Sequence, residues 1–274
     1  MRSLARVSPR AVLAVAACLG LWAALMLSLA RCDGGVTPSA SLLQEPAAAL
    51  VAGTGPADPA APDGDGVVSF VAPAPTARRA RPRTQAPLAV LRAPRADAGT
   101  VVTLPPTTTL GSARVLLVLG TEGGWVHVAL PTRPNGGAGW VRASDVQVQV
   151  VEQSVTVDLS ARTLQVWVRG KPSWSSRVAV GAAGTPTPTG AFYVTDRVRP
   201  TDPAGLYGPF ALGLSAHSDT LTSFGDGDAQ IGVHGTDEPA SVGHAATHGC
   251  LRLPNSVASR LADLPLGTPV RIVA

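Results

Sequence analysis

Residue types suited to nucleophilic chemistry lie close together near the end of this 274-residue chain. Cys250 comes two residues after His248 and follows His234 across fifteen intervening positions. A free thiol is mostly protonated at neutral pH, and a histidine that accepts its proton raises the reactive fraction. Gly249 lets the backbone approach a substrate closely, and N–H groups near Cys250 can face a developing oxyanion. The spacing indicates a cysteine nucleophile paired with a histidine.

Two other interpretations of these residues stay open. An unpaired cysteine is commonly a buried core residue that has no chemical role. A zinc site is the second alternative, because His234, His244, His248 and Cys250 are all zinc-ligand types. Only His244 and His248 have a spacing typical of structural zinc sites, so we predict no metal and no cofactor.

The elements that must position these residues are mainly strands. An apolar/polar alternation at 154–159, a turn and a return strand at 164–168 predict an opening hairpin. Further strands are expected at 177–180, 192–194 and 270–273. Residues 197–227 are rich in Gly, Pro and Asp and predict a long irregular region, and Asn255 can cap one short helix that ends near Asp263.

Two sequence motifs in this part of the chain resemble a known family. His-Gly-Thr at 234–236 followed by Thr-His-Gly-Cys-Leu-Arg at 247–252 resembles the signature of the L,D-transpeptidase catalytic domain (YkuD-like). Thr-Pro-Thr-Pro-Thr-Gly at 185–190 is similar to the Thr-Pro-x-Gly turn of the same family. Thr247 stands where a serine is more frequent, and both residues offer a hydroxyl. The resemblance covers 153–274 and implies a β-sandwich with one short helix.

The resemblance also implies peptidoglycan cross-linking. Members of the family attack the bond between the L-centre of a diamino acid and the terminal D-alanine of a tetrapeptide stem. They form a thioester and pass the acyl group to an amine of a neighbouring stem. In this chain Cys250 would be the nucleophile and His234 the general base and acid, with a backbone carbonyl near Gly235 orienting the imidazole. Carbapenem β-lactams would be inhibitors.

Other residues of the motifs receive less definite roles. His248 lines the site and either helps to position the thiol or only fixes the turn, and Gly249 allows close approach of the backbone. Arg252 binds a substrate carboxylate or instead pairs with Asp237 or Glu238. Tyr207 lies in the irregular region, which by resemblance forms a flap over the substrate groove. His244 receives no role.

Several functional alternatives remain at this level. The acyl acceptor can be another stem peptide, water or a protein amine, so the enzyme can be an L,D-carboxypeptidase. A catalytically idle wall-binding module is a further alternative, although the presence of both His234 and Cys250 favours an enzyme. The identity of the diamino acid and the oligomeric state do not follow from the sequence.

A second, smaller domain is predicted at 87–148. Five short apolar runs separated by turn signals suggest a small barrel, and Asn135-Gly136-Gly137 predicts a hairpin. Gly-Trp-Val-His-Val at 124–128 and Gly-Trp-Val at 139–141 resemble the bacterial SH3-like domain. Trp125 and Trp140 pack in the barrel or form a ligand-binding face. We expect that removing this domain weakens action on intact sacculi more than on soluble muropeptides.

The N-terminal part predicts export. Three arginines precede an uncharged run at 11–30, and twenty helical residues span about 30 Å, the thickness of a bilayer's hydrocarbon core. We therefore assign 1–32 to a signal or membrane anchor, either cleaved, lipidated at Cys32 or retained. Residues 33–86 are a disordered Pro/Ala/Gly-rich linker. We expect a protein of the cell envelope, anchored on the outer face of the plasma membrane or secreted to the wall.

The charge of the chain excludes one class of partner. A formal net charge of +4 without a basic-aromatic motif argues against nucleic-acid binding. The four arginines between 78 and 83 form either a solvated cluster or a contact with anionic wall polymers or lipid headgroups.

Overall fold

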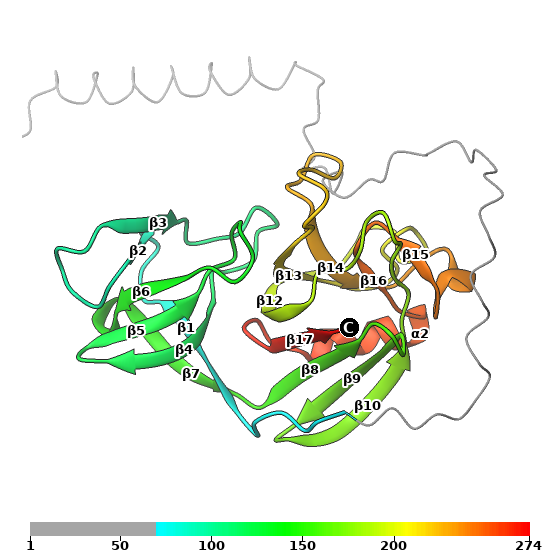
Figure 1. Ribbon diagram of the computed structural model, residues 1–274, viewed down its shortest axis with the longest axis horizontal. Helices are drawn as coiled ribbons and strands as arrows, with labels where there is room; N and C mark the ends of the chain where they lie inside the picture. Colours follow the sequence, from blue (N-terminus) through cyan, green and yellow to red (C-terminus); the bar gives the residue numbers. More distant parts are fainter. Residues whose placement is uncertain (1–69) are drawn as a thin grey trace, which may run out of the picture. The chain divides into compact units, whose positions relative to one another are not determined.

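A computed structural model describes residues 70–274, in which two β-sheets dominate (Figure 1). The predicted membrane segment at 11–30, Cys32 and most of the predicted linker lie outside the described residues. Within the described part, none of the helices has the length and apolar character needed to cross a membrane.

The first sheet has seven strands in the order β3-β2-β6-β5-β4-β1-β7. Their bounds are β1 Ala77–Pro82, β2 Leu88–Leu91, β3 Thr100–Leu104, β4 Leu116–Glu122, β5 Trp125–Ala129, β6 Ala138–Arg142 and β7 Val146–Val151. Each of the five predicted apolar runs falls on one or more of these strands, and β5 and β6 pair through the predicted hairpin.

The predicted extent of the linker is wrong at its C-terminal end. Residues 77–82 form β1, which pairs with β4 and with all six residues of Val146–Val151. This segment reads as linker because it contains Pro82 and four of its six residues are Arg or Pro. It is a strand because β4 and β7 provide hydrogen-bonding partners from far along the chain, and because Ala80 is fully buried between them.

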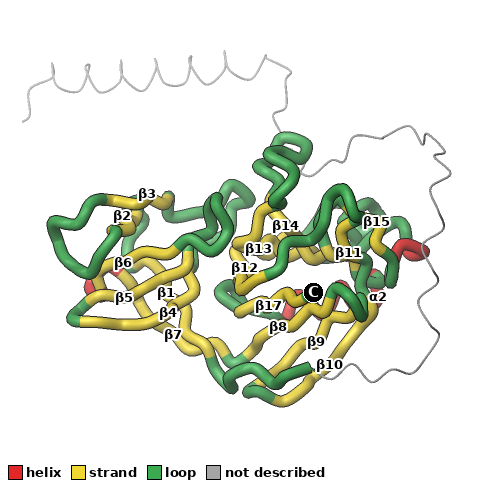
Figure 2. The backbone as a smooth tube through the Cα atoms, in the orientation of Figure 1, coloured by secondary structure: helices red, strands yellow, loops and turns green. Residues whose placement is uncertain are grey.

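The second sheet has eight strands in the order β10-β9-β8-β17-β12-β13-β14-β16, and a separate pair joins β11 and β15 (Figure 2). Their bounds are β8 Gln153–Asp158, β9 Thr163–Val168, β10 Lys171–Arg177, β11 Val180–Gly181, β12 Gly190–Val198, β13 Ala211–His217, β14 Gln230–His234, β15 Ala245–Thr247, β16 Leu251–Arg252 and β17 Pro269–Val273. The predicted opening hairpin corresponds to β8 and β9.

One strand of this sheet lies inside the region predicted to be irregular. Residues 211–217 form β13, which pairs with β12 on one side and β14 on the other. All seven residues of β13 are buried, so the segment shows no apolar/polar alternation that would reveal a strand. The irregular parts are therefore two separate loops, at 199–210 and 218–229, on either side of β13.

The helix after the cysteine has the predicted extent, but only its first four residues are α-helical. An α-helix, α2, spans Asn255–Ala258, and a 3₁₀ helix continues over Ser259–Asp263. Pro254 occupies the N-cap position, and the Asn255 side chain has another partner: its Oδ1 accepts the N–H of Thr236 at 2.7 Å.

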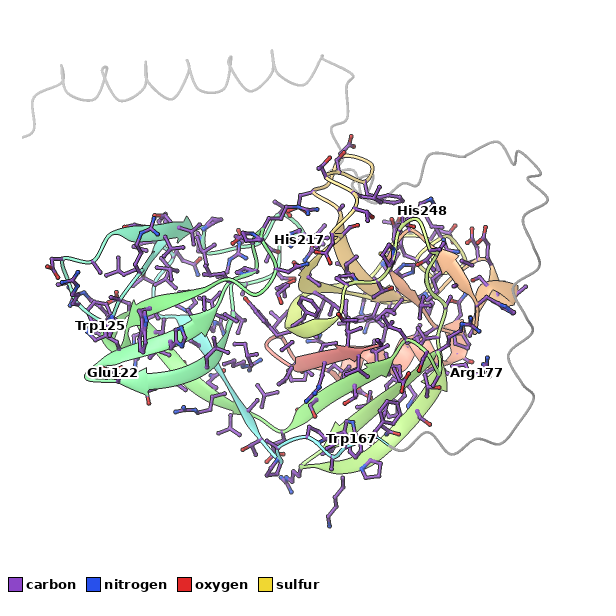
Figure 3. The ribbon with its side chains drawn as sticks, viewed as in Figure 1. Glu122, Trp125, Trp167, Arg177, His217 and His248 are labelled. Atoms are coloured by element: carbon purple, nitrogen blue, oxygen red, sulfur yellow. The ribbon has the colours of Figure 1, made fainter. Side chains whose placement is uncertain are left out.

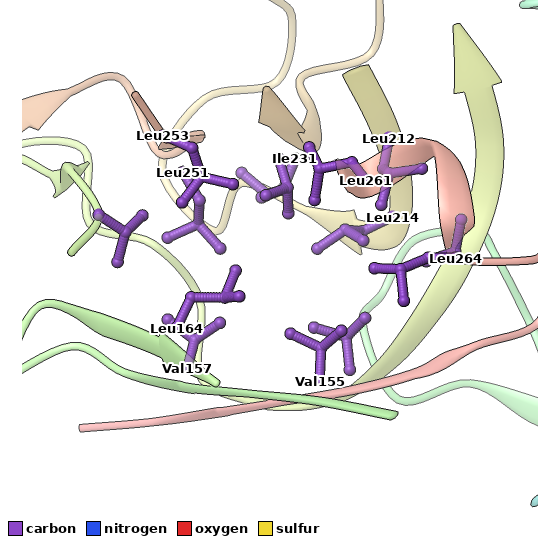
Figure 4. Packing of buried hydrophobic residues seen from close by; sticks show 14 of the residues in the cluster. Val155, Val157, Leu164, Leu212, Leu214, Ile231, Leu251, Leu253, Leu261 and Leu264 are labelled. Atoms are coloured by element: carbon purple, nitrogen blue, oxygen red, sulfur yellow. The ribbon is translucent and has the colours of Figure 1, made fainter. Parts of the chain in front are cut away.

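The core of the second sheet lies where the sheet folds over itself. Figure 4 shows Val155, Val157 and Leu164 of β8 and β9 facing a set from the later strands, which includes Leu212, Leu214, Ile231, Leu251 and Leu253. All of these side chains are buried. Burying an aliphatic side chain contributes about 1.5–3 kcal/mol, so this packing fixes β14, which carries His234, and β16, which directly follows Cys250.

Candidate active site

His234 and Cys250 come together because β14 and β16 are parallel neighbours. Val233 pairs with Leu251 and His234 with Arg252, which places Cys250 just before β16 at the level of Gly232. Gly232 and His234 are two residues apart on β14, so they face the same side of the sheet. A Cβ at Gly232 would lie 3.7 Å from His234 Cδ2 and 3.9 Å from Cys250 Sγ. The nearest atom would be Leu212 O on β13, at 3.2 Å, so the backbone of β13 leaves the least room for a side chain at this position.

The imidazole of His234 is held in one orientation. The ring is buried, and its Nδ1 lies 2.5 Å from the carbonyl oxygen of Gly235. Because a carbonyl only accepts, Nδ1 carries the proton and Nε2 is left with the free lone pair. The ring of Tyr207 meets the ring of His234 edge-on at 4.8 Å. The predicted carbonyl near the imidazole is thus that of Gly235.

Burial also sets the charge of this histidine. The pKa of His234 is lowered to about 4, mainly by desolvation and to a smaller extent by the charge of Arg252, while the hydrogen bond to Gly235 opposes the shift. At neutral pH the imidazole is therefore uncharged. A neutral ring with a free Nε2 can accept a proton from a thiol.

A network of threonine hydroxyls holds the turn that carries the cysteine. The Thr247 hydroxyl donates to Cys250 O at 2.6 Å and accepts the N–H of Gly249 at 3.1 Å. The Thr187 hydroxyl donates to Gly249 O at 2.8 Å and accepts the N–H of Gly181 at 2.9 Å. Gly249 has φ +119°, a conformation that residues with a side chain rarely adopt. The N–H of Gly249 is thus engaged with Thr247.

The thiol opens into a cavity. Cys250 is half-buried, and Sγ accepts the N–H of Gly232 at 3.4 Å. Tyr207, His234 and His248 line this cavity together with apolar side chains, among them Leu110, Leu221, Phe224 and Ile231. His248 is exposed on the connection between β15 and β16 (Figure 3), and its ring lies 5.3 Å from that of Phe224.

Arg252 does not line this cavity. Its side chain is 3% exposed, and Nη1 forms an ion pair with Glu238 Oε2 at 2.6 Å. Of the two alternatives considered for Arg252, the structure shows the pairing with Glu238. In the described residues, no group of three or more His, Cys, Asp or Glu side chains is placed to hold a metal ion.

Several residues of the site were not identified from the sequence. Thr187 belongs to the motif at 185–190, and Gly232 lies two residues before the motif at 234–236, so both positions lay within or beside a recognised motif. Phe224 lies in the region predicted to be a flap. Nothing in the sequence indicated Leu110, because it lies far from the catalytic motifs along the chain, in the connection between β3 and β4.

Comparison with known families assigns the second sheet. Residues 152–272 match the YkuD family, described as the L,D-transpeptidase catalytic domain. Residues 152–272 are an L,D-transpeptidase catalytic domain. The resemblance carried by the cysteine and histidine motifs is thereby confirmed for this part of the chain.

A curated relative supports the same assignment. YkuD of Bacillus subtilis (strain 168), named provisionally as an L,D-transpeptidase, is 35% identical over 119 residues, which are 43% of this chain and 64% of that protein. The chain thus spans slightly less than two thirds of the relative's length.

Two solved structures also match. The catalytic domain of an E. faecium L,D-transpeptidase is 25% identical with a TM-score of 0.33, covering 44% of this chain and 96% of that one. L,D-transpeptidase 3 from Mycobacterium tuberculosis, in complex with a faropenem-derived adduct, is 15% identical with a TM-score of 0.37, covering 57% and 97%.

Proposed function

We propose that this protein is a cysteine-dependent peptidoglycan L,D-transpeptidase that joins the diamino acids of two stem peptides. One observation carries the proposal: the side chains of His234 and Cys250 both lie next to Gly232 and line the same cavity of an L,D-transpeptidase catalytic domain. The neutral imidazole, with Nδ1–H fixed on Gly235, presents Nε2 as the base.

The first half of the reaction forms a thioester. Nε2 of His234 takes the thiol proton of Cys250, and Sγ attacks the carbonyl carbon between the diamino acid and the terminal D-alanine. The C–N bond breaks, the imidazolium gives its proton to the departing amine, and D-alanine leaves. The thioester then holds the remaining tripeptide stem on Cys250.

The second half transfers the acyl group. The side-chain amine of a neighbouring diamino acid attacks the thioester carbonyl, His234 accepts the amine proton, and the thiolate leaves and is reprotonated. This forms one amide bond for the one broken, so the cross-link needs no external energy source. Water in place of the amine would make the protein an L,D-carboxypeptidase.

The chemistry of the site also supports a class of inhibitor. A β-lactam carbonyl is an activated acyl donor, and attack by the Cys250 thiolate opens the ring and leaves a thioester. We propose carbapenems as such acyl donors for this protein.

We propose that the enzyme works at the cell envelope. We propose a membrane anchor or export signal at 1–32, on the basis of the arginine-flanked apolar run at 11–30. We also propose that the first sheet is an SH3-like domain, supported by the Trp-containing motifs at 124–128 and 139–141. His127 stacks on Trp140 at 4.5 Å and Arg142 lies 4.8 Å over Trp125, so both indole rings already have packing partners within the sheet.

Incubation of the purified full chain with soluble muropeptides tests the proposal. With tetrapeptide stems, the wild-type protein should release D-alanine and form dimers joined between diamino acids, and pentapeptide stems should be poor donors. Cys250→Ala should abolish both products. D-alanine release without dimers would make the protein a carboxypeptidase. No product from any stem, together with binding to sacculi, would make it a wall-binding module.

A further inference from the structure

The loop at 218–229 forms one side of the cavity that contains Cys250. Leu221 and Phe224 of this loop line the cavity, and the ring of Phe224 lies 5.3 Å from that of His248. Because His248 is two residues from the nucleophile, the position of this loop determines the shape of the groove beside the thiol.

The backbone hydrogen bonds within the loop are short-range. The N–H of Ser218 donates to Ala229 O at 2.9 Å, and Phe224 and Gly227 exchange two backbone hydrogen bonds of 3.0 Å. Between Ser218 and Ala229, which are buried, every residue is exposed or half-buried. Segments with so few buried contacts open at low free energy, so the loop's position depends on contacts from outside it.

The β5–β6 turn of the first sheet provides such contacts. Arg133 donates from Nη1 to Ser218 O at 2.7 Å, and from Nη2 to Leu221 O at 2.8 Å and Asp228 O at 2.7 Å. One guanidinium thus joins the beginning, the middle and the end of the loop. A planar group with donors in fixed directions suits this arrangement.

The amide of Asn135 holds the strand that leads into the loop. Its Nδ2 donates to His217 O at 2.7 Å, and its Oδ1 accepts the N–H of His217 at 2.9 Å. These are the two bonds that a neighbouring strand would make to the end of β13. His217 is buried (Figure 3), and its Nε2 lies 2.9 Å from Asp228 Oδ2 at the far end of the loop.

A second connection from the first sheet reaches the same cavity. Leu110, between β3 and β4, lines the cavity with Phe224. Its neighbours are fastened to β12: the Thr108 hydroxyl donates to the buried carboxylate of Asp196, and the Ser112 hydroxyl accepts the N–H of Arg197 at 3.2 Å.

We infer that the first sheet completes the substrate groove of the catalytic domain, with Arg133 and Asn135 as positioning residues for the 218–229 loop and Leu110 as part of the groove wall. This inference rests on the proposed transpeptidase function. The apolar side chains at this end of the cavity suit the aliphatic part of a stem peptide. The first sheet is therefore needed for the reaction with soluble muropeptides as well as with intact sacculi. The sequence led us to expect that its removal would affect the reaction with intact sacculi more.

The experiment compares two forms of the full chain: the wild type, and a double variant that carries both Arg133→Met and Asn135→Leu. Arg133→Lys keeps the positive charge but has one nitrogen in place of the planar guanidinium. Arg142→Met is the matched control, since Arg142 lies over Trp125 in the same sheet. Amide hydrogen exchange of 218–229 reports the loop without any substrate. Two rates report the site: thioester formation from a tetrapeptide muropeptide, and alkylation of Cys250 by iodoacetamide, which needs no groove.

In the double variant, the amides of 218–229 should exchange at least about tenfold faster, since the variant removes the hydrogen bonds that Arg133 and Asn135 make to this loop and to His217. Muropeptide acylation should fall at least about tenfold, because small misplacements are costly in catalysis. Iodoacetamide alkylation should change less than about twofold, and a thermal unfolding scan should show that the variant is folded. Arg133→Lys should recover part of the acylation rate, and Arg142→Met should match the wild type.

Unchanged exchange in the double variant would overturn the inference. Equal losses of muropeptide acylation and iodoacetamide alkylation would overturn it too, because they would reflect general damage to the site. A wild-type protein that acylates with no muropeptide contradicts the proposed function instead, and the exchange measurement then still decides whether the first sheet positions the loop.

Discussion

Replacing Thr247 by valine should loosen the turn that presents the nucleophile. Valine has nearly the shape of threonine but lacks the hydroxyl that donates to Cys250 O at 2.6 Å and accepts the N–H of Gly249 at 3.1 Å. Thr247 is 2% exposed, so water does not readily replace the lost partner.

The cost follows from the groups left behind. Leaving one buried donor or acceptor unsatisfied costs about 1–3 kcal/mol, and Thr247→Val affects one donor and one acceptor. We expect the free energy of unfolding to fall by about 2–6 kcal/mol. Thr247→Ser keeps the hydroxyl and removes one methyl group, which costs about 0.5–1.5 kcal/mol by analogy with Ile→Val.

The effect on reactivity should be larger than the effect on stability suggests. Without the hydroxyl, the turn at Gly249 loses the hydrogen bonds to Gly249 N–H and Cys250 O, and Cys250 can shift. A displacement of about 1 Å at a reacting group costs about 100-fold in rate. Thr247→Ser should stay within about threefold of the wild type, since it preserves both hydrogen bonds.

Urea unfolding and intact-mass kinetics of carbapenem acylation measure these two quantities on the same three proteins. The comparison between valine and serine is the informative one, because both variants alter the packing but only valine removes the hydroxyl. If valine and serine agree within about 0.5 kcal/mol in stability and acylate at the same rate, the hydroxyl does not hold the turn.

Three further predictions concern the thiol and the imidazole. Gly232→Ala should slow iodoacetamide alkylation of Cys250, because the added Cβ would lie only 3.2 Å from Leu212 O on β13 and so must shift β14, which carries His234, although its contacts with His234 Cδ2 at 3.7 Å and Cys250 Sγ at 3.9 Å are ordinary; an unchanged rate would show that β14 and the thiol tolerate the added methyl group. Since burial lowers the pKa of His234 to about 4 from its usual ~6.5, the unfolded chain binds more protons between these values, and the wild type should lose up to about 3 kcal/mol relative to His234→Gln as the pH falls from 6.5 to 4. Parallel stability curves for the two proteins would contradict the shift. A carbapenem should add its full mass to the wild type and nothing to Cys250→Ala, and an adduct on the variant would place the reactive residue elsewhere.

The sequence indicates the chemistry well because the chemistry is local. Cys250 lies within a short motif, and its partner His234 opens the same stretch, so the two could be paired before the strands were known. The surrounding strands with alternating or bounded apolar runs, such as β8 and β9, were predicted for the same reason.

Elements that depend on distant contacts were missed. Ala211–His217 is buried on both faces and gives no alternation, so it was assigned to the irregular region. Ala77–Pro82 is a strand only because β4 and β7 pair with it. Asn255 was expected to cap its own helix, but its side chain instead accepts a hydrogen bond from Thr236. In each case the sequence near the residue favours one structure and the packing of distant segments favours another.

Arg133 and Asn135 show the same limit for function. They belong to a turn that predicts a hairpin, and nothing nearby indicates that their side chains reach a loop 80 to 95 residues further on, where Arg133 Nη2 meets Asp228 O at 2.7 Å. Because the contacting residues are so far apart along the chain, the sequence did not predict that the first sheet contacts the groove.

The central claim is that Cys250 takes the acyl group of a tetrapeptide stem as a thioester while D-alanine leaves. Intact-mass measurement of the full chain mixed with a tetrapeptide muropeptide, followed by peptide mapping, tests it directly. The account predicts an added mass equal to the muropeptide minus D-alanine, located on Cys250 and absent from Cys250→Ala. An adduct that persists in Cys250→Ala, or one that retains the D-alanine, would contradict it.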